Sequence, residues 1–411
     1  MHNYQHIHLS FLQNPNPKAS IIEMSDHLPA DAVGNILSRL PVKSLVRFRC
    51  VSKPWCALID SPDFIKTHLN RSVQNSSNLS LIVKGKGLYS VDFDTLHRTV
   101  ELDYTFMNSD APDVLGSCNG LLLVGQGHVF YLWNPSTRKY RQLPILPIQS
   151  PNKSVGFICK TYGFGYDSIN DDYKVVRIVE FTGKQHDWFI SEVQSYSLKS
   201  NSWRRIQDFP YSLPFKLVWG VKDRDILYSV VRRKLVPNSP RFIVAFDIGA
   251  EEYRLVPQPD YSFKDFEISV GVLGGCLCIN GFCRDHFDVW IMKDYGVKES
   301  WIKLLSVAPP IVRNVNGVCP LAYSKSGGEI LIHGDARLFW YEHTRKTVRE
   351  ARVRGLPNPF YSEVCVGSLV PLNGYGGSKG IKEEDVQEKG KGKKSSKKRD
   401  DFLSVGFKLK L

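Results

Sequence analysis

Four residues that commonly bind metal lie close together in the last third of the sequence. They are Cys276, Cys278, Cys283 and His286, and thiolate and imidazole groups are the usual ligands of zinc. The first pair has C-x-C spacing, however, and not the common C-x2-C spacing. Cys276 and Cys278 also alternate within an apolar run, so they point to one side of a strand, where small buried residues belong. We therefore interpret this cluster as part of a strand and not as a zinc site.

Two further groups of residues that could do chemistry have structural explanations. Asp171-Asp172 falls between two apolar runs, where aspartate favours a turn. Gly163-Phe164-Gly165 lacks the following helix that a phosphate-binding loop requires. No G-x-S-x-G, H-E-x-x-H or Walker motif occurs. The sequence therefore predicts no catalytic residue, no cofactor and no bound metal.

The charge of the chain is strongly positive. The 411 residues carry a formal net charge of +13, of which the last part, 373–411, contributes eleven Lys/Arg and six Asp/Glu, a net of +5. The remaining +8 is spread over the other residues. This favours acidic partners without implying nucleic acid.

Cysteine use and the terminal segment indicate the compartment. The nine cysteines follow no repeating framework, Met1–Ile22 is too polar for a signal peptide, and no run has the apolar length of a membrane span. We therefore expect an intracellular protein with reduced thiols and no membrane span.

One stretch near the start, Leu28–Ile59, has apolar residues at helical spacing and two Leu-Pro pairs. Pro29 suits a helix start, and Val33, Ile36, Leu37 and Leu40 follow at i, i+3, i+4 and i+7, so they form one stripe. Pro41 ends that helix. A second helix is predicted from about Val42 and a third from about Lys53. Three helices in about forty residues cannot bury all these apolar side chains, so they either dock on another protein or form a cap on the main domain.

The motifs LPVKSL (Leu40–Leu45) and RFRCVSKPW (Arg47–Trp55), followed by Leu58-Ile59, resemble the plant form of the F-box. F-box proteins dock on the Skp-type adaptor of a cullin–RING ubiquitin ligase. The resemblance implies an adaptor interface, with its supporting residues, made of Leu28, Pro29, Ile36, Leu37, Leu40, Pro41, Leu45, Cys50, Val51 and Trp55. Gly34 departs from the pattern, since glycine weakens a helix interior by about 1 kcal/mol relative to alanine, so this helix is expected to become fully ordered on the adaptor.

Beyond residue 78 the sequence changes to short β-rich runs that repeat. Each copy has a strand, a polar turn and a strand that opens with an aromatic residue. The copies are LWNPSTRKYRQL (Leu132–Leu143), SYSLKSNSWRRI (Ser195–Ile206), FDIGAEEYRLV (Phe246–Val256), WIMKDYGVKESWIKL (Trp290–Leu304) and WYEHTRKTVREARV (Trp340–Val353), with a weaker one at Val91–Leu102. A period near fifty residues with several strands predicts an all-β propeller of about six blades.

Within each copy, the aromatic residue after the turn is predicted to fill the space between blades. These positions are Tyr140, Trp203, Tyr253 and Trp301, with Val348 in the last copy. The segment Val364–Leu372 is predicted to close the ring by pairing near Leu79–Lys84.

The amino-acid sequences of the copies also resemble the F-box-associated, kelch-like domain of plant F-box proteins. CNGLL (Cys118–Leu122) and YGFGYDSINDDYKVVRI (Tyr162–Ile178) carry this resemblance with the copies above. The resemblance includes the kelch-like plant F-box proteins that restrain defence signalling and the S-locus F-box proteins of pollen recognition, and the ending DDFLSVGFKLKL (Asp400–Leu411) favours the defence-restraining branch. The resemblance implies a receptor that brings a target protein to ubiquitylation and degradation, with a nucleotide-binding leucine-rich-repeat immune receptor as a possible target.

The resulting domain prediction has five parts. They are a flexible leader (1–24), a three-helix F-box (25–68), a polar linker (69–78), the propeller (79–372) and a low-complexity tail (373–411). The F-box and the propeller are expected to have separate cores. In the tail, Lys393, Lys394, Lys397, Lys398 and Arg399 are either a nuclear import signal, a nucleic-acid patch or a solvated charge run. We expect the nucleus and cytoplasm as locations.

Target binding is assigned by sequence to loops of the propeller. Tyr211, Phe215, Arg232 and Arg233 lie in Pro-rich segments that combine aromatic and basic residues, and such residues are favoured at binding hot spots. The alternative is that these loops only connect blades. Two other functions stay open at this stage, an enzyme with a site in the propeller and a nucleic-acid-binding protein that uses its basic tail.

Overall fold

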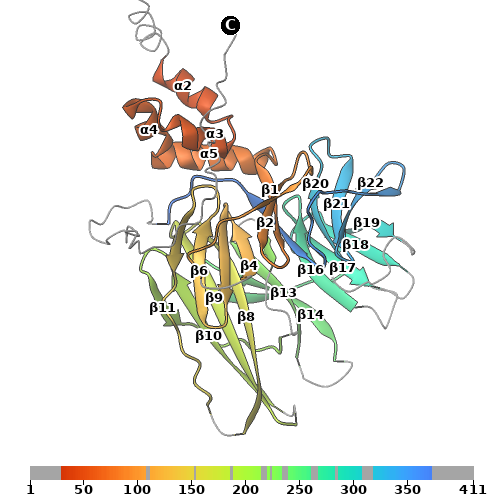
Figure 1. Ribbon diagram of the computed structural model, residues 1–411. Helices are drawn as coiled ribbons and strands as arrows, with labels where there is room; N and C mark the ends of the chain where they lie inside the picture. The colour runs from red at the N-terminus through yellow and green to blue at the C-terminus, as the bar shows by residue number, and fades with distance from the viewer. Residues whose placement is uncertain are drawn as a thin grey trace, which may run out of the picture. The chain divides into compact units, whose positions relative to one another are not determined.

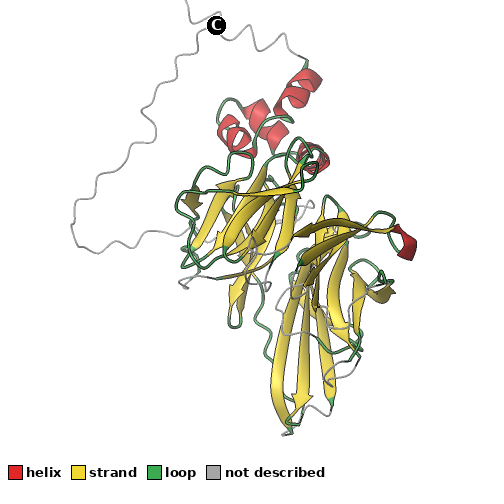
Figure 2. Cartoon of the chain, turned by 90° about the vertical axis from the view of Figure 1, so that its right-hand side faces the viewer, coloured by secondary structure: helices red, strands yellow, loops and turns green. Residues whose placement is uncertain are grey.

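A computed structural model of the protein describes residues 29–107, 112–151, 154–185, 188–213, 220–222, 225–233, 239–260, 267–282, 286–307 and 318–372. Helices form the first part of this chain and strands form the rest, apart from one short 3-10 helix, η1 (Lys298–Ser300) (Figures 1 and 2). The predicted leader and tail lie outside the described residues. No helix of the described part is long and apolar enough to cross a membrane.

Within the described residues, the N-terminal region consists of four helices. They are α2 (Ala30–Leu37), α3 (Val42–Phe48), α4 (Lys53–Ile59) and α5 (Pro62–Gln74). Pro29 and Pro41 hold extended backbone at the entry to α2 and α3. Ser52 and Ser61 cap α4 and α5, because each side chain accepts a hydrogen bond from a backbone N–H of the first turn. The three predicted helices are confirmed, and α5 is a fourth.

The predicted linker over residues 69–78 is wrong in its first half, because α5 continues to Gln74. The buried side chains of α5 are Phe64, Ile65, His68, Leu69 and Ser72, which follow one helical stripe. The polar residues between them face solvent. Because these residues are polar, the sequence of this segment alone resembles a linker. Only residues 75–78 connect the helices to the first strand.

Six antiparallel sheets of four strands each form the propeller, as predicted. From the innermost strand outward, blade 1 is β24 (Tyr361–Val366), β1 (Leu79–Lys84), β2 (Leu88–Asp92) and β3 (Thr99–Glu101). Blade 2 is β4 (Asp113–Cys118), β5 (Leu121–Gln126), β6 (Val129–Asn134) and β7 (Lys139–Gln142). Blade 3 is β8 (Val155–Asp167), β9 (Asp172–Gly183), β10 (Phe189–Ser197) and β11 (Ser202–Arg205).

The other three blades have the same order. Blade 4 is β12 (Gly220–Lys222), β13 (Ile226–Arg232), β14 (Arg241–Asp247) and β15 (Glu252–Val256). Blade 5 is β16 (Glu267–Leu273), β17 (Cys276–Phe282), β18 (Phe287–Met292) and β19 (Trp301–Val307). Blade 6 is β20 (Cys319–Tyr323), β21 (Glu329–Gly334), β22 (Arg337–Glu342) and β23 (Thr347–Glu350).

The ring closes through the end of the propeller sequence. Strand β24 supplies the innermost strand of blade 1 and pairs with β1 from Leu79 opposite Val366 to Lys84 opposite Tyr361. This confirms the predicted pairing partner, although the strand ends at Val366. Beyond it, the side-chain amide of Asn134 in blade 2 donates to the carbonyls of Ser368 and Val370, at 3.1 and 3.0 Å.

The prediction for the aromatic residues after the turns needs a correction. Trp301 is buried, but Trp203 and Tyr253 are half-buried and Tyr140 is 45% exposed. All of them lie on the outermost strand of a blade, where one side faces solvent. The buried repeat position is the one opposite, in the third strand just before the turn. It is occupied by Val91, Trp133, Tyr196, Phe246, Met292 and Tyr341, all of which are buried.

The helices and the propeller share one core, which corrects the prediction of separate cores. A single cluster of buried residues contains Leu45 and Leu69 of the helices, Leu121 and Phe164 of blades 2 and 3, and Val370 after the last strand. This contact agrees with the alternative prediction, in which the helices form a cap packed on the main domain. A surface for another protein is then left on the other sides of the helices.

Candidate interaction surfaces

The predicted adaptor residues divide into an exposed and a buried group. The exposed ones are Pro29, Ile36, Pro41, Cys50 and Val51. Ile36 and Val51 are 55% and 60% exposed, and together with the neighbouring prolines they leave apolar surface on the helices that a partner could cover. Leu37 and Leu45 are buried, Leu40 and Trp55 are half-buried, and Leu28 lies outside the described residues. The exposed group is called the F-box face below.

Helix α5 forms hydrogen bonds to the segment between α2 and α3, which carries part of the F-box face. The Nε2 atom of His68 lies 2.9 Å from the carbonyl oxygen of Leu40 and donates to it, and burial lowers the pKa of this imidazole. Arg71 donates from Nη1 to the hydroxyl of Ser38 at 2.9 Å. The neutral histidine and the arginine thus fix the end of α2 and the turn before α3.

Polar contacts join the same helix to the propeller. Lys66 of α5 forms an ion pair with Asp171, in the turn between β8 and β9, at 3.1 Å, and the hydroxyl of Tyr166 also donates to that carboxylate. The backbone N–H of Gly367 donates to the carbonyl of Asn78 at 2.7 Å. These contacts and the shared core connect the F-box face to the strands.

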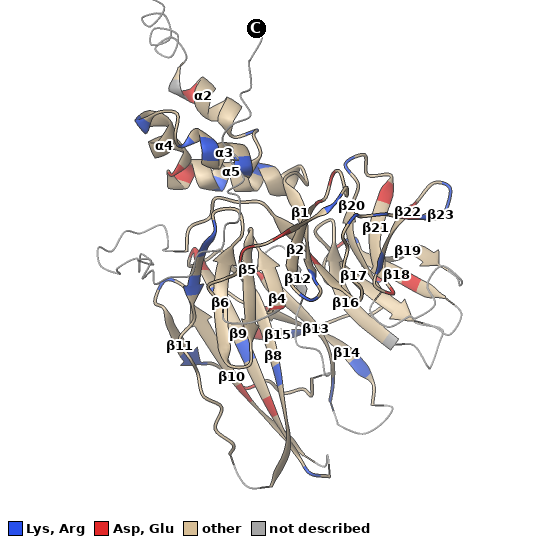
Figure 3. Ribbon diagram, in the orientation of Figure 1, with Lys and Arg blue, Asp and Glu red and all other residues tan. Residues whose placement is uncertain are grey.

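The charged side chains of the helices from α3 to α5 are mainly basic (Figure 3). Between residues 42 and 74 the sequence has six Lys/Arg and two Asp/Glu. Arg49 pairs with Asp60 at 2.7 Å, so most of the positive charge stays unneutralised. A partner of these helices should therefore be acidic.

The ends of the strands define two sides of the propeller. The side that contains the β8–β9 turn at Asp171, next to α5, is called the proximal side, and the opposite strand ends form the distal side. Blade 3 is longer than its neighbour, since β8, β9 and β10 have 13, 12 and 9 residues while no strand of blade 2 exceeds 6.

The structure brings three of the four predicted target-binding residues together on the distal side. Ser212 pairs with Arg232 in an isolated bridge, so Tyr211 lies beside Arg232 and Arg233. The ring of Tyr211 packs against Phe209, with 5.5 Å between ring centroids, and the Arg233 guanidinium lies 5.0 Å from the centroid of Phe242. Phe215 lies outside the described residues, and Tyr211 is half-buried.

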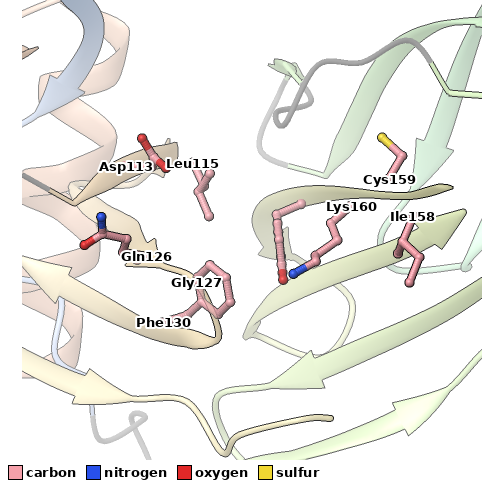
Figure 4. A pocket seen from close by; sticks show the side chains of 10 residues that line it. Asp113, Leu115, Gln126, Gly127, Phe130, Ile158, Cys159 and Lys160 are labelled. Atoms are coloured by element: carbon pink, nitrogen blue, oxygen red, sulfur yellow. The ribbon is translucent and has the colours of Figure 1, made fainter. Parts of the chain in front are cut away.

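A pocket of about 400 Å³ opens on the distal side between blades 2 and 3. It is lined by Asp113, Leu115, Gly125, Gln126, Gly127, Phe130, Ile158, Cys159, Lys160 and Tyr162 (Figure 4). Sequence reasoning missed this pocket. The available signal was the length of the two apolar runs around Asp171, which exceeds the usual length of a propeller strand.

The candidate metal ligands do not form a described site. Cys276 and Cys278 lie on β17, and complete burial raises the pKa of the Cys278 thiol, so it stays protonated. His286 lies 3.5 Å from the carboxylate of Asp288, and Cys283 is outside the described residues. Among the described residues, no group of His, Cys, Asp and Glu could hold a metal ion.

Comparison with known proteins agrees with this architecture. Residues 25–67 match the F-box domain and residues 73–368 match the F-box associated beta propeller domain. The chain therefore belongs to the family of F-box proteins that carry an F-box-associated β-propeller, which confirms the resemblance found in the sequence.

Three relatives come from Arabidopsis thaliana. F-box protein CPR1 is 36% identical, covering 93% of this chain and 99% of that protein. F-box protein At4g22390 is 33% identical with the same coverage. F-box/kelch-repeat protein At3g23880 is 32% identical, covering 68% of this chain and 79% of that protein.

Proposed function

We propose that this protein is the substrate-recognition subunit of an SCF-type E3 ubiquitin ligase. The F-box implies partnership with a Skp-type adaptor and a cullin. The observation that carries the proposal is the F-box face, where Ile36 and Val51 are more than half exposed on helices whose other side is buried. The basic character of these helices supports an acidic adaptor.

In this function the protein needs no reaction of its own. The adaptor binds one region and the target binds the other, so a target lysine reaches a high effective concentration near the ubiquitin carrier. The contacts between α5 and the propeller support this role, because they hold the target at a fixed distance from the adaptor.

Affinity purification of the tagged protein from plant cells tests the proposal. We expect the wild type to recover adaptor and cullin, and Leu28-Pro29→Ala-Ala or Leu40-Pro41→Ala-Ala to recover neither. Ile145→Asp is the matched control, since Ile145 is 59% exposed on the propeller and not on the F-box face. A wild-type protein that recovers neither adaptor nor cullin would contradict the proposal.

For the target, we propose a protein of plant defence signalling, a nucleotide-binding leucine-rich-repeat immune receptor. The support is the family resemblance in the sequence and the similarity to F-box protein CPR1. Changing Tyr211, Phe215, Arg232 and Arg233 together to Ala should slow turnover of such a receptor while adaptor binding persists. Unchanged receptor turnover in that variant, with the adaptor still bound, would remove these residues from the proposal.

We also propose that the protein works in the nucleus and the cytoplasm. The support is the basic run that contains Lys393, Lys394, Lys397, Lys398 and Arg399. Deleting residues 380–399 from a fluorescent fusion should lower the nuclear-to-cytoplasmic ratio. An unaltered nuclear-to-cytoplasmic ratio would mean that the basic run is a solvated stretch of charge and not an import signal.

A further inference from the structure

The distal part of blade 3 extends beyond blade 2. The two blades are in contact up to Tyr162, whose ring lies 4.5 Å from that of Phe130, and Asn119 donates to the hydroxyl of Tyr173 at 3.1 Å on the proximal side. Strand β8 begins at Val155, on the distal side of these contacts, and its first residues, Val155–Lys160, are called the overhang below. At about 3.3 Å per residue these six residues span roughly 20 Å.

One side of the overhang exposes two apolar side chains, one of which lines the pocket. Ile158 pairs with Phe181 and Phe181 pairs with Ile190, and side chains that are directly opposite in a sheet point to the same side. Ile158 and Ile190 are 46% and 43% exposed, whereas Phe181 between them is 2% exposed, so the protein itself already covers that ring. Ile158 and Ile190 are called the shelf below. Ile158 also lines the pocket, so shelf and pocket form one surface.

The other side of the overhang is covered by the chain itself. Glu180 points to that side, where its carboxylate accepts hydrogen bonds from the hydroxyl of Ser212 and the backbone N–H of Leu213. Ser191, in the same row of the sheet, donates to the carbonyl of Phe209 at 2.8 Å. The segment that covers this side is thus the one that contains Tyr211.

The pocket contains an uncompensated positive charge. Lys160 extends into it (Figure 4) and forms no ion pair within the part of the chain that the structure describes. The carboxylate of Asp113 is already paired with Lys84, and Arg177, in the next row behind the pocket, lies 4.0 Å from Glu192. Among the described residues, the net charge around the opening is therefore positive, which favours a carboxylate on the molecule that fills it.

We propose that the shelf and the pocket together bind an extended acidic segment of the target protein. This inference rests on the proposed function. An apolar side chain of the segment packs on the shelf beside Ile158, and an Asp or Glu two positions away, on the same side of an extended chain, reaches the Nζ of Lys160. The pocket volume lies within the range of about 300 to 1,000 Å³ that is usual for ligand sites.

A phage-displayed library of random 12-residue peptides, selected on the immobilised full-length protein, tests this surface. We expect enrichment of peptides with an apolar residue two positions from Asp or Glu. The strongest of them, made as a fluorescent synthetic peptide, should bind Lys160→Glu about tenfold more weakly or worse, a loss of about 1.4 kcal/mol. Selection on Lys160→Glu should instead enrich Lys or Arg at the acidic position.

Two further variants complete the experiment. Ile158→Asp/Ile190→Asp should lose the apolar preference, and Lys86→Glu, which changes an exposed lysine in the neighbouring β1–β2 turn, should bind the peptide as the wild type does. Circular dichroism checks that every variant is folded. Absence of acidic enrichment on the wild type, or equal peptide binding by Lys160→Glu, would overturn the inference.

The same protein preparations are titrated with purified Skp-type adaptor. Adaptor binding without peptide selectivity would reject this surface and leave the proposed function standing. Peptide selectivity without adaptor binding would support the surface and reject the ubiquitin-ligase role.

Discussion

The F-box helices and the distal part of blade 3 both expose large apolar side chains, but for different structural reasons. The helices are 7 to 13 residues long, so each has too few turns to bury all its apolar positions once α5 and the propeller cover one side. Blade 3 exposes Ile158 and Ile190 because its strands continue after blade 2 has ended.

The two surfaces differ in how the sequence encodes them. The F-box face is encoded in short motifs at fixed spacings, which the family match includes. The blade 3 surface depends on strand length and register, so its chemistry is set by a few residues such as Lys160.

The largest expected effect is a loss of stability when the buried repeat position of a blade is changed. Trp133→Ala removes a ring that is 1% exposed before its turn, and should lower the free energy of unfolding by about 3 to 5 kcal/mol. Tyr140→Ala, directly opposite after the turn, should cost less than about 1.5 kcal/mol, since half of that ring is already in water. Urea denaturation measures both, and equal losses would mean that the buried repeat position is wrongly assigned.

The second prediction concerns how the stability of the helices and of blade 6 depends on pH. Burial lowers the pKa of His333 to about 4 and lowers that of His68 as well, so both are neutral in the native state. The unfolded chain binds these protons near pH 6.5. Stability is therefore complete above pH 6.5 and falls as the pH drops toward 4, by about 2 to 3 kcal/mol for His333 at pH 4.5.

Urea denaturation at pH 7.5, 6.0 and 4.5 measures this loss. His333→Asn and His68→Asn should each flatten the acid dependence of the free energy of unfolding. An acid dependence that is the same in both variants and in the wild type would contradict the assignment of these two histidines.

The third effect concerns the closure of the ring. Asn134→Ala removes the amide that donates to the carbonyls of Ser368 and Val370 and leaves these buried oxygens unpaired. The expected loss is about 1 to 3 kcal/mol, with faster proteolysis after residue 366. Thr137→Ala, in the same turn, is the control, and cleavage at the wild-type rate in Asn134→Ala would show that the amide is dispensable.

The smallest effect is a gain of stability in the helices. Gly34 lies inside α2, and a Cβ added there meets nothing within 4 Å, so Gly34→Ala should stabilise the helix by about 1 kcal/mol. Gly120→Ala should destabilise instead, because its φ is +84° and its Cβ would lie 2.3 Å from the hydroxyl oxygen of Ser368. Thermal unfolding should move in opposite directions for the two variants, and a lower midpoint for Gly34→Ala would contradict the helix geometry.

Much of the fold could be predicted from the sequence because its signals are local or periodic. Pro29 and Pro41 precede helices α2 and α3, and copies of one turn give the number of blades. The misses are non-local: the exposure of Tyr140 depends on the outer edge of the sheet, and the helical state of residues 69–74 depends on what α5 packs against. The pocket at Lys160 depends on the difference in length between two blades, which no single motif contains.

The central claim is that the F-box face binds an adaptor while the propeller stays free for a target. Isothermal titration of purified Skp-type adaptor into the full-length protein tests it most directly, with Ile36→Asp/Val51→Asp beside Ile145→Asp. We expect the wild type and Ile145→Asp to bind alike, and Ile36→Asp/Val51→Asp to bind at least about a hundredfold more weakly, as for the loss of two interface anchors, with an unchanged unfolding midpoint. Equal adaptor affinity in all three proteins, or no binding by the wild type, would contradict the account.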